Sequence, residues 1–347
     1  MVNYQTMWAT PRYSRGRVDN AGATLAESSD GVIDDDALEI ISNWRASHRF
    51  PLNTLQIGLR RLATLADSNS LISQRLKRLS SISLKLQRFP SMKLSQMQDI
   101  GGARAVVRSI SSVRRIMDGY EDSAQKHTLV RCNDYISEPK DSGYRGVHLI
   151  YRYYSDRNDT YNRLKIELQI RTGLQHAWAT AVEIIGTFIS QSLKSSQGEE
   201  EWLRFFALMG SAIALRERAA PVPITPTSAT ALRRELRHYV KTLQVRSHLQ
   251  AYGMALETLQ KPRKSDRFFL LQLDPAASTL SISGYKSAAF EQATNDYLAA
   301  EERAISNRHN TDAVLVAVDS LEALRRAYPN YFLDTRVFIN AVDKAIR

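Results

Sequence analysis

The amino-acid sequence predicts an α/β (α+β) fold, a mixed β-sheet flanked by helices with a second, smaller α/β module at the C-terminus. The clearest signal is residues 164–172, where apolar and polar side chains alternate strictly, as in a strand with one buried face. Apolar residues recur at helical spacing before and after this segment, at 71–86 and 174–189. A stretch with three prolines, 219–230, then separates these elements from a further set of strands and helices.

Taken in order, residues 1–34 show little periodicity and are predicted to form a flexible arm. A helix with acidic residues in its first turn is expected from residue 33 until Pro51 breaks it, and a second helix follows at 53–66. The spacing of apolar residues predicts another helix over 71–86. Three short strands are expected next, at 99–107, 128–134 and 144–154.

The composition divides the chain into four parts. Residues 35–193 form the predicted main domain, and residues 194–228 are predicted to be a helix followed by a Pro-rich linker. Residues 229–347 are predicted to form a C-terminal α/β module, possessing enough strands and apolar helix faces to fold alone. Its expected elements are a helix over 229–259, a hairpin of strands 268–274 and 278–285, and a strand at 313–319 between two helices.

The overall composition is that of a globular protein. The chain has 347 residues, of which 43% are hydrophobic and 24% charged. No apolar run approaches the roughly 20 residues that span a bilayer, and the N-terminus lacks the apolar core of a signal peptide. The single cysteine, Cys132, cannot form an internal disulfide, and no Cys/His set is present that would hold structural zinc. We therefore expect a cytoplasmic protein without a membrane partner.

The charge of the chain points to anionic partners. The net charge is +11 and the sequence pI is about 9.7. Seven basic residues lie between 60 and 88, against one acid, Asp67; they are Arg60, Arg61, Arg75, Lys77, Arg78, Lys85 and Arg88. A solvated helix face is the simpler interpretation of such a run. The alternative is a surface that binds nucleotide phosphates, an RNA backbone such as tRNA or ribosomal RNA, or both.

Along 164–172 the polar positions carry a carboxylate, an amide and a guanidinium in one row: Glu167, Gln169 and Arg171. Such a row is typical of a site that binds something charged. The segments around this row also match known sequence motifs. The segments DYISEPKDSGYRGVH (134–148), IELQIRT (166–172) and QHAWA (175–179), preceded by RLKRLSSISLKL (75–86) and DIGGARAVV (99–107), resemble the synthetase domain of the RelA/SpoT family. The motifs occur in the family's order between Arg75 and Glu183.

The resemblance implies a nucleotidyltransferase-like mixed sheet and an ATP-dependent pyrophosphokinase. Such an enzyme moves the β- and γ-phosphates of ATP to the ribose 3′-hydroxyl of GDP or GTP, making (p)ppGpp and AMP in the stringent response. The chemistry needs metal ions, cations for the phosphates and a base near the attacking hydroxyl. The family pattern implies that Asp99 and Glu167 hold Mg²⁺ and act in catalysis. It assigns ATP binding to Arg75, Lys77, Lys85 and Arg104.

The same resemblance implies an acceptor site. Tyr144 follows a glycine in a tight turn, so that its ring can stack on the guanine of the acceptor. Lys140 and His148 match positions near the acceptor's phosphates and base, while Gln169 and Arg171 support the site. The sequence has no His-Asp dipeptide of the type used by the family's hydrolase domain. A member that makes alarmones without degrading them is therefore expected.

Some residues depart from the family pattern, mainly on the acceptor side. Ser142 replaces an asparagine of the acceptor loop, and Glu183 only approximates a Glu-His pair. The open alternatives are a toxic member that pyrophosphorylates tRNA 3′ ends or adenosine nucleotides, and a non-catalytic nucleotide- or RNA-binding regulator. A homo-oligomer is a further possibility. Near the C-terminus, Tyr328 and Tyr331 flank Pro329; they are expected either to pack at a helix-terminating turn or to enter the adenine pocket and inhibit the enzyme.

Overall fold

One mixed sheet organises the molecule. The structure, a computed structural model, describes residues 8–27, 34–123, 126–192, 199–254, 257–258, 266–274, 279–306, 312–318, 321–328 and 335–347. Within these ranges, nine strands form a sheet in the order β3-β4-β5-β2-β1-β9-β7-β8-β6. The pairs β2–β5 and β6–β8 are parallel and the others antiparallel, which confirms the predicted mixed sheet. The strands are β1 (Leu71–Leu76), β2 (Gly101–Val107), β3 (Thr128–Asp134), β4 (Val147–Arg152), β5 (Lys165–Thr172), β6 (Glu257–Thr258), β7 (Phe268–Asp274), β8 (Thr279–Tyr285) and β9 (Asp312–Ala317).

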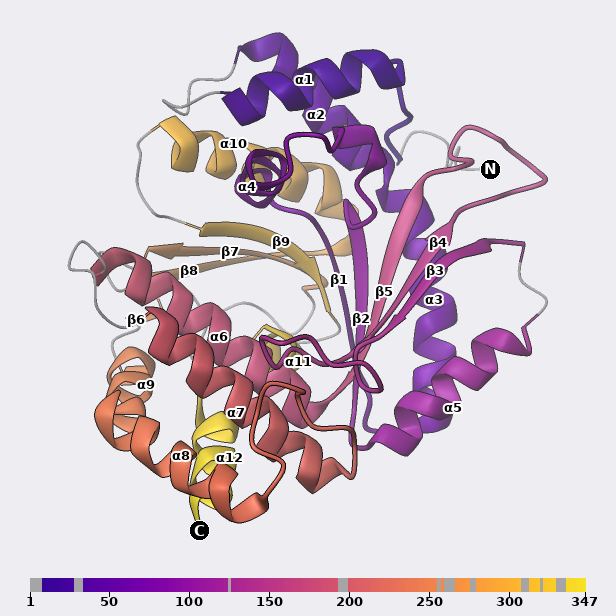
Figure 1. Cartoon of the computed structure of the whole chain (residues 1–347). Coiled ribbons are helices and arrows are strands. Elements are labelled where there is room, and N and C mark those ends of the chain that lie inside the picture. The colour runs from indigo at the N-terminus through magenta and orange to yellow at the C-terminus, as the bar shows by residue number, and fades with distance from the viewer. Residues whose placement is uncertain are drawn as a thin grey trace.

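Helices flank this sheet, as Figure 1 shows. They are α1 (Arg15–Glu27), α2 (Asp35–Ser47), α3 (Arg49–Ala66), α4 (Leu79–Arg88), α5 (Ile110–Glu121), α6 (Gly173–Ser192), α7 (Glu199–Glu217), α8 (Ala229–Thr242), α9 (Val245–Met254), α10 (Phe290–Ser306), α11 (Leu321–Ala327) and α12 (Arg336–Ile346). Pro51 lies in the first turn of α3, where its missing N–H costs no helical hydrogen bond. The break between the first two predicted helices falls instead at His48. None of the helices in the described ranges has the length and apolar character that a bilayer crossing requires.

Two predictions near the N-terminus are wrong. Part of the predicted flexible arm forms α1, whose Val18 and Leu25 are buried against α2 and α4. Residues 71–76, predicted as helix, form strand β1 between β2 and β9. Ile72 and Leu76 share a face at helical spacing, but they also share a face of a strand, so their spacing does not separate the two structures. Pairing with strands on both sides decides the outcome.

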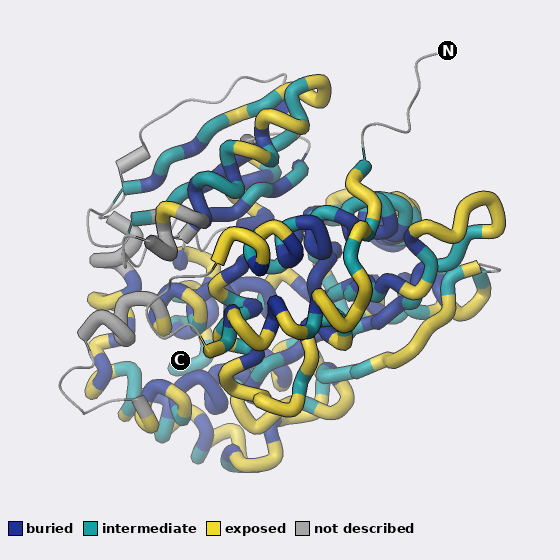
Figure 2. The backbone as a smooth tube through the Cα atoms, turned by 90° about the horizontal axis from the view of Figure 1, so that it is seen from above, coloured by how far each residue is buried: buried dark blue, intermediate teal, exposed yellow. Residues whose placement is uncertain are grey.

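The alternation along the strands separates two faces of the sheet. On one face, α3 and α5 pack against Ile72, Ala103, Leu168 and other alternate residues of β1, β2, β5 and β4. On the same face, α10 packs against Ala313 and Leu315 of β9. The opposite face carries α11. Figure 2 shows the buried residues concentrated through the middle of the molecule, between the exposed loops and outer helix faces.

The C-terminal elements continue the same sheet instead of forming a second one. Strand β9 pairs antiparallel with β1 through Gln74–Ala317 and Arg75–Val316. At one end of the molecule, α6, α7, α8 and α12 share a core that contains Trp178, Phe205 and Phe338. The predicted C-terminal module, 229–347, therefore shares its sheet and its core with the preceding residues. Whether either part folds alone stays a prediction.

The segment predicted as a linker is docked. The backbone N–H of Val222 donates to Ser211 Oγ at 2.8 Å, and Ser211 Oγ and Thr225 Oγ1 lie 2.6 Å apart, both buried. Prolines at 221, 223 and 226 interrupt regular structure, yet the segment lies on α7 because Val222 is buried there. The proline content thus correctly predicted the end of a helix, whereas the inference of a free linker is wrong.

Candidate active site

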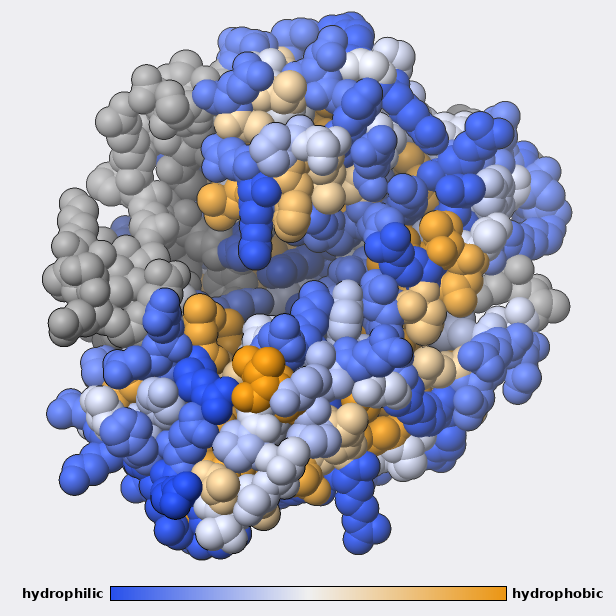
Figure 3. Space-filling model, viewed as in Figure 1, coloured by the Kyte–Doolittle hydropathy of each residue, from blue (hydrophilic) through white to orange (hydrophobic). Residues whose placement is uncertain are grey.

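The register of four neighbouring strands gathers polar side chains in one row. His148 on β4 lies opposite Gln169 on β5, which lies opposite Arg104 on β2, which lies opposite Ser73 on β1. The row points away from α3, because the alternate residues of these strands are buried against that helix. Figure 3 shows the surface hollowed between α4 and α6, with hydrophilic residues in the hollow. Arg104 Nε donates to Gln169 Oε1 at 3.3 Å within the row.

Glu167 lies two residues before Gln169 on the same face of strand β5, and its carboxylate contacts two neighbouring side chains. Its Oε1 is 2.9 Å from His148 Nδ1, and its Oε2 accepts from Gln169 Nε2 at 2.6 Å. Burial raises the pKa of Glu167, but the hydrogen bonds from His148 and Gln169 keep that pKa below its ordinary value. Glu167 is therefore an ionised carboxylate in a largely enclosed place, which suits a base or a metal ligand.

Asp99 stands immediately before β2, where two lysines hold it. Lys77 Nζ, just after β1, lies 2.7 Å from Asp99 Oδ2, and Lys85 Nζ of α4 lies 2.9 Å from Oδ1. Burial raises the pKa of Asp99, but the charges of Lys77 and Lys85 lower it more strongly, so the group is ionised. The charge of Asp99 in turn acts to raise the pKa of Glu167. Glu167 is paired in register with Gly102, three residues after Asp99, so both carboxylates lie near the same end of the adjacent strands β5 and β2.

The acceptor loop brings Tyr144 to the same site. Tyr144 Oη lies 2.6 Å from His148 Nε2, so a ring protonated on Nδ1 donates to Glu167 and accepts from Tyr144. Lys140 Nζ lies 4.3 Å from the centroid of the Tyr135 ring and 5.4 Å from that of Tyr144. Tyr135 was not among the predicted residues, and its ring meets those of Tyr144 and His148 edge-on. The stacking role of Tyr144 stays a prediction.

The loop is held in place by close contact with α7. Gly143 has φ +91°, and a Cβ there would lie 2.7 Å from the carbonyl oxygen of Phe206, so this position requires glycine. Arg145 is buried and donates to the carbonyls of Gly210 at 3.3 Å, Ile136 at 3.2 Å and Ala220. Burial lowers the pKa of Arg145 to about 10. Sequence reasoning missed Arg145, because a loop arginine beside a binding motif gives no sign that it is buried.

The comparisons with known proteins concern the segment that carries these side chains. Residues 74–185 match the family model described as "Region found in RelA / SpoT proteins". Over this region, the chain is similar to RelA/SpoT proteins. Every predicted site residue lies inside the RelA/SpoT region.

Several known proteins are similar to this chain. The GTP pyrophosphokinase YjbM of Bacillus subtilis is 32% identical over 128 residues, which are 35% of this chain and 60% of YjbM. The GTP pyrophosphokinase YwaC of the same organism is 26% identical over 164 residues, 42% of this chain and 76% of YwaC. Among solved structures, the small alarmone synthetase 1 from B. subtilis bound to its product pppGpp is 25% identical, covering 60% of this chain and 96% of that one, with a TM-score of 0.36. The chain thus spans only part of the length of YjbM.

One residue predicted for the acceptor site is buried next to Tyr144. Arg171, in the RelA/SpoT region, is buried and donates from Nη2 to His176 Nδ1, while His176 Nε2 lies 3.1 Å from the carbonyl oxygen of Arg326. Burial, together with the charge of Arg104, lowers the pKa of Arg171 to about 9. Burial also lowers the pKa of His176 well below its ordinary value, so its ring is neutral. Arg171 therefore joins β5 to the end of α11.

Tyr328, outside the RelA/SpoT region, reaches the predicted ATP site. Its ring is buried, and its hydroxyl donates to the carbonyl of Gln74 at 3.2 Å. Burial raises the pKa of Tyr328, while the charges of Arg75 and Arg104 act in the opposite direction. The Tyr328 hydroxyl thus lies at the backbone next to Arg75, one of the residues predicted to hold ATP. It also packs with Leu71, Val316 and other apolar residues. Tyr331, its predicted companion, lies outside the described residues.

The basic run between 60 and 88 does not form a single surface. Lys77 and Lys85 lie at Asp99, and Arg75 lies beside Tyr328. Arg60 and Arg61 belong to α3, which covers the opposite face of the sheet. The folded chain therefore divides the run between the site and a remote helix.

Proposed function

We propose that this protein is a nucleotide pyrophosphokinase that transfers the β- and γ-phosphates of ATP to the ribose 3′-hydroxyl of GDP or GTP. The products are AMP and ppGpp or pppGpp. The observation that carries the proposal is the pair of ionised carboxylates, Asp99 and Glu167, among Lys77, Lys85 and Arg104 inside the RelA/SpoT region. Carboxylates beside several cations suit phosphoryl chemistry, in which most of the catalysis is positioning and charge stabilisation.

The side chains suggest a division of labour. Glu167 accepts the proton of the acceptor's 3′-hydroxyl, and His148 orients it through the 2.9 Å contact with Nδ1. Lys77 and Lys85 exchange Asp99 for the phosphate oxygens of ATP when the nucleotide binds. Arg104 carries a forked guanidinium that suits the triphosphate. Lys140 and Tyr144, on the loop held by α7, receive the acceptor nucleotide.

Magnesium fits the donor set of this site. Carboxylate oxygens are ligands that Mg²⁺ prefers, and both Asp99 and Glu167 are ionised. Among the described residues, no three His, Cys, Asp or Glu side chains gather in a metal-binding group. Nucleotide phosphates would therefore complete the coordination shell, as is usual for Mg²⁺. When bound by Asp99 and Glu167, the ion would neutralise the negative charge that develops on the phosphates during transfer.

We also propose that the C-terminal part regulates the enzyme by holding Tyr328 in the ATP site. ATP and the Tyr328 ring would compete for the space beside Arg75 and Arg104. Strand β9, paired with β1, and the contact of His176 with the Arg326 carbonyl both hold this part against the site. Movement of α11 away from the sheet would open the ATP site.

The test incubates the purified full chain with ATP labelled in its γ-phosphate and with GDP, GTP, ATP alone or tRNA as acceptor. Labelled ppGpp or pppGpp is the expected product. Labelled tRNA or adenosine nucleotide would identify the alternative acceptors instead. The Tyr328→Ala variant is assayed in parallel, so that a closed ATP site is not mistaken for a lack of activity. If neither protein labels any acceptor, or if Glu167→Gln keeps full activity, the proposal is wrong.

A further inference from the structure

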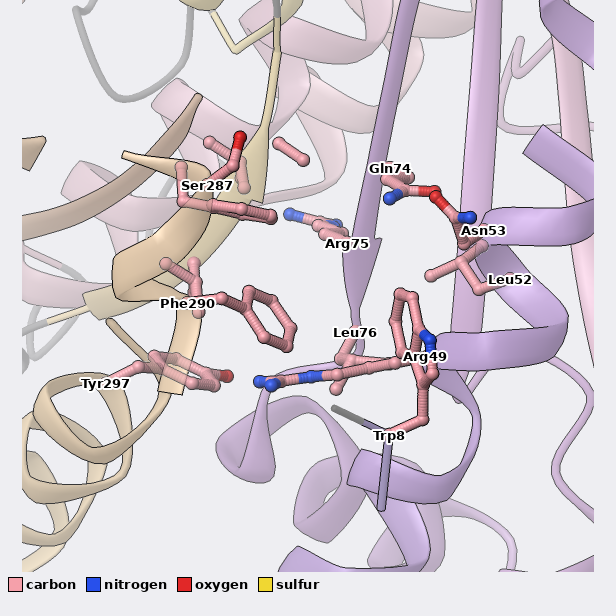
Figure 4. A pocket seen from close by; sticks show the side chains of 14 residues that line it. Trp8, Arg49, Leu52, Asn53, Gln74, Arg75, Leu76, Ser287, Phe290 and Tyr297 are labelled. Carbon is pink, nitrogen blue, oxygen red and sulfur yellow. The ribbon is translucent and has the colours of Figure 1, made fainter. Parts of the chain in front are cut away.

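A second cavity opens on the face of the sheet that carries α3 and α10, and Arg75, a residue of the predicted ATP site, also lines it. It has a volume of about 330 Å³ and lies between α3, β1, β7, β9 and α10, with Trp8 at its border (Figure 4). Gln74 and Leu76 of β1 and Leu315 and Ala317 of β9 contribute to its wall. Their strand neighbours Leu71 and Val316 pack on the α11 side, so these residues face α3 and α10. The cavity therefore spans the seam between the RelA/SpoT region and the C-terminal part.

Arg49, in the first turn of α3, supplies a cation to this cavity. Its guanidinium lies 4.8 Å from the centre of the Phe290 ring, and Nη1 donates to Thr294 Oγ1. Within the described part of the chain, Arg49 has no ion pair, whereas the neighbouring Arg45 is paired with Glu301 at 2.6 Å. Burial and the charge of Arg45 lower the pKa of Arg49 to about 10. Glu301 and Tyr297 act in the opposite direction but do not outweigh these two effects. Because burial makes a cation costly, an anion beside Arg49 in the cavity would be stabilised.

A second polar group in the wall lacks a hydrogen-bond partner among the described residues. Gln74 Oε1 is buried and finds no hydrogen-bond partner among the described residues, although it borders the cavity. A buried acceptor left unpaired costs about 1–3 kcal/mol, which a donor on a ligand would recover. The rest of the wall is largely apolar and includes Leu52, Leu76 and Phe290. Ligand sites commonly combine such apolar walls with a few convergent polar groups.

We propose that this cavity binds a small aromatic acid. The carboxylate would pair with Arg49, the ring would lie against Phe290 and Leu76, and a hydroxyl or N–H group would donate to Gln74 Oε1. The volume is at the lower end of the range for ligand pockets, about 300–1,000 Å³, which favours a single-ring compound over a nucleotide. Since α3 and β1 form one side and β9 and α10 the other, the ligand would stabilise the joined arrangement of the two parts. This inference does not depend on the proposed activity.

The experiment titrates the full chain with 4-hydroxyphenylacetate by calorimetry. Binding of one molecule per chain is expected. Phenylacetate, which lacks the hydroxyl, and 4-hydroxyphenylacetamide, which lacks the charge, should each bind at least about tenfold more weakly. Arg49→Met should abolish the preference for the acid over the amide. Arg61→Met, an exposed arginine on the same helix, should leave binding unchanged.

A second variant keeps the test decisive if Arg49→Met fails to fold. Ala317→Phe fills the cavity without altering its charge and should block all three compounds. Circular dichroism of each variant establishes that it is folded. The inference is overturned if the folded parent chain binds none of the compounds at millimolar concentration. It is equally overturned if acid and amide bind alike, or if binding survives in Ala317→Phe.

Discussion

The buried ion pair between Arg45 and Glu301 offers the sharpest test of how the C-terminal part is joined to the rest. Arg45 Nη1 lies 2.6 Å from Glu301 Oε2, and both side chains are almost fully buried, at 2% and 8% exposure. Glu301 Oε1 also accepts from the backbone N–H of Leu79 at 2.9 Å, at the start of α4. Arg45 Nε donates to the carbonyl of Lys77 at 2.9 Å. Glu301 of α10 thus fixes the backbone between Lys77 and Lys85, directly at Leu79 and through Arg45 at Lys77.

We predict that Glu301→Gln lowers the free energy of unfolding by about 3–5 kcal/mol, because it leaves the Arg45 charge buried without a counter-ion. A matched control is Glu235→Gln, which breaks the Arg204–Glu235 pair, with a similar distance of 2.7 Å but 28% exposure on both sides. That loss should be about 0–1 kcal/mol. Both values are measured by urea denaturation of the full chain, followed by circular dichroism.

Two results would refute this reasoning. One is a loss in Glu301→Gln no larger than that in Glu235→Gln. The other concerns the double variant Arg45→Met/Glu301→Leu, which removes both charges and should recover part of the loss. A double variant less stable than Glu301→Gln would show that packing around the pair, and not its charge, holds α10 in place.

The remaining predictions concern activity. Glu167→Gln should reduce kcat roughly 100- to 10,000-fold, since the amide cannot accept a proton. The control, Glu138→Gln at an exposed position, should not change kcat. Similar rates for the two variants in the labelled-ATP assay would contradict the role of Glu167. Tyr144→Ala should cost about 1–3 kcal/mol of acceptor binding, or roughly 5- to 150-fold in the acceptor KM. An equal change in the KM of ATP would count against stacking. Tyr328→Ala should increase transfer and lower the KM for ATP, while Tyr328→Phe, which keeps the ring and loses the bond to the Gln74 carbonyl, should resemble the parent. A folded Tyr328→Ala with unchanged kinetics would exclude competition between the ring and ATP.

The sequence predicted the candidate site well where the signal was local. Strict alternation along 164–172 placed Glu167 and Gln169 on one polar face, and strand β5 confirms it. The motifs around Asp99 and Tyr144 indicated which other side chains belong with that face. Their contacts with Lys77, Lys85 and His148 required the folded chain, because they join residues from four separate segments.

Other features could not be predicted because they depend on long-range pairing. Residues 71–76 have apolar positions compatible with either helix or strand, and β2 and β9 on either side make them a strand. Burial of Arg145 and Arg171 depends on α7 and α11, which lie far along the chain. The proline content at 219–230 reveals no partner, so the docking of that segment on α7 was missed.

By itself, then, the sequence determined the mixed sheet, the resemblance of the central region to RelA/SpoT proteins and the side chains proposed for its chemistry, since these follow from alternation and from ordered local motifs. Only the tertiary structure decided that the strands of the C-terminal part join the same sheet and that the Tyr328 hydroxyl lies at the backbone next to Arg75. Strands β1 and β9 pair through residues about 240 positions apart in the chain. The alternation of apolar and polar residues within a strand does not specify which other strand it will pair with. The strands pair in the order that allows helices to bury both faces of the sheet.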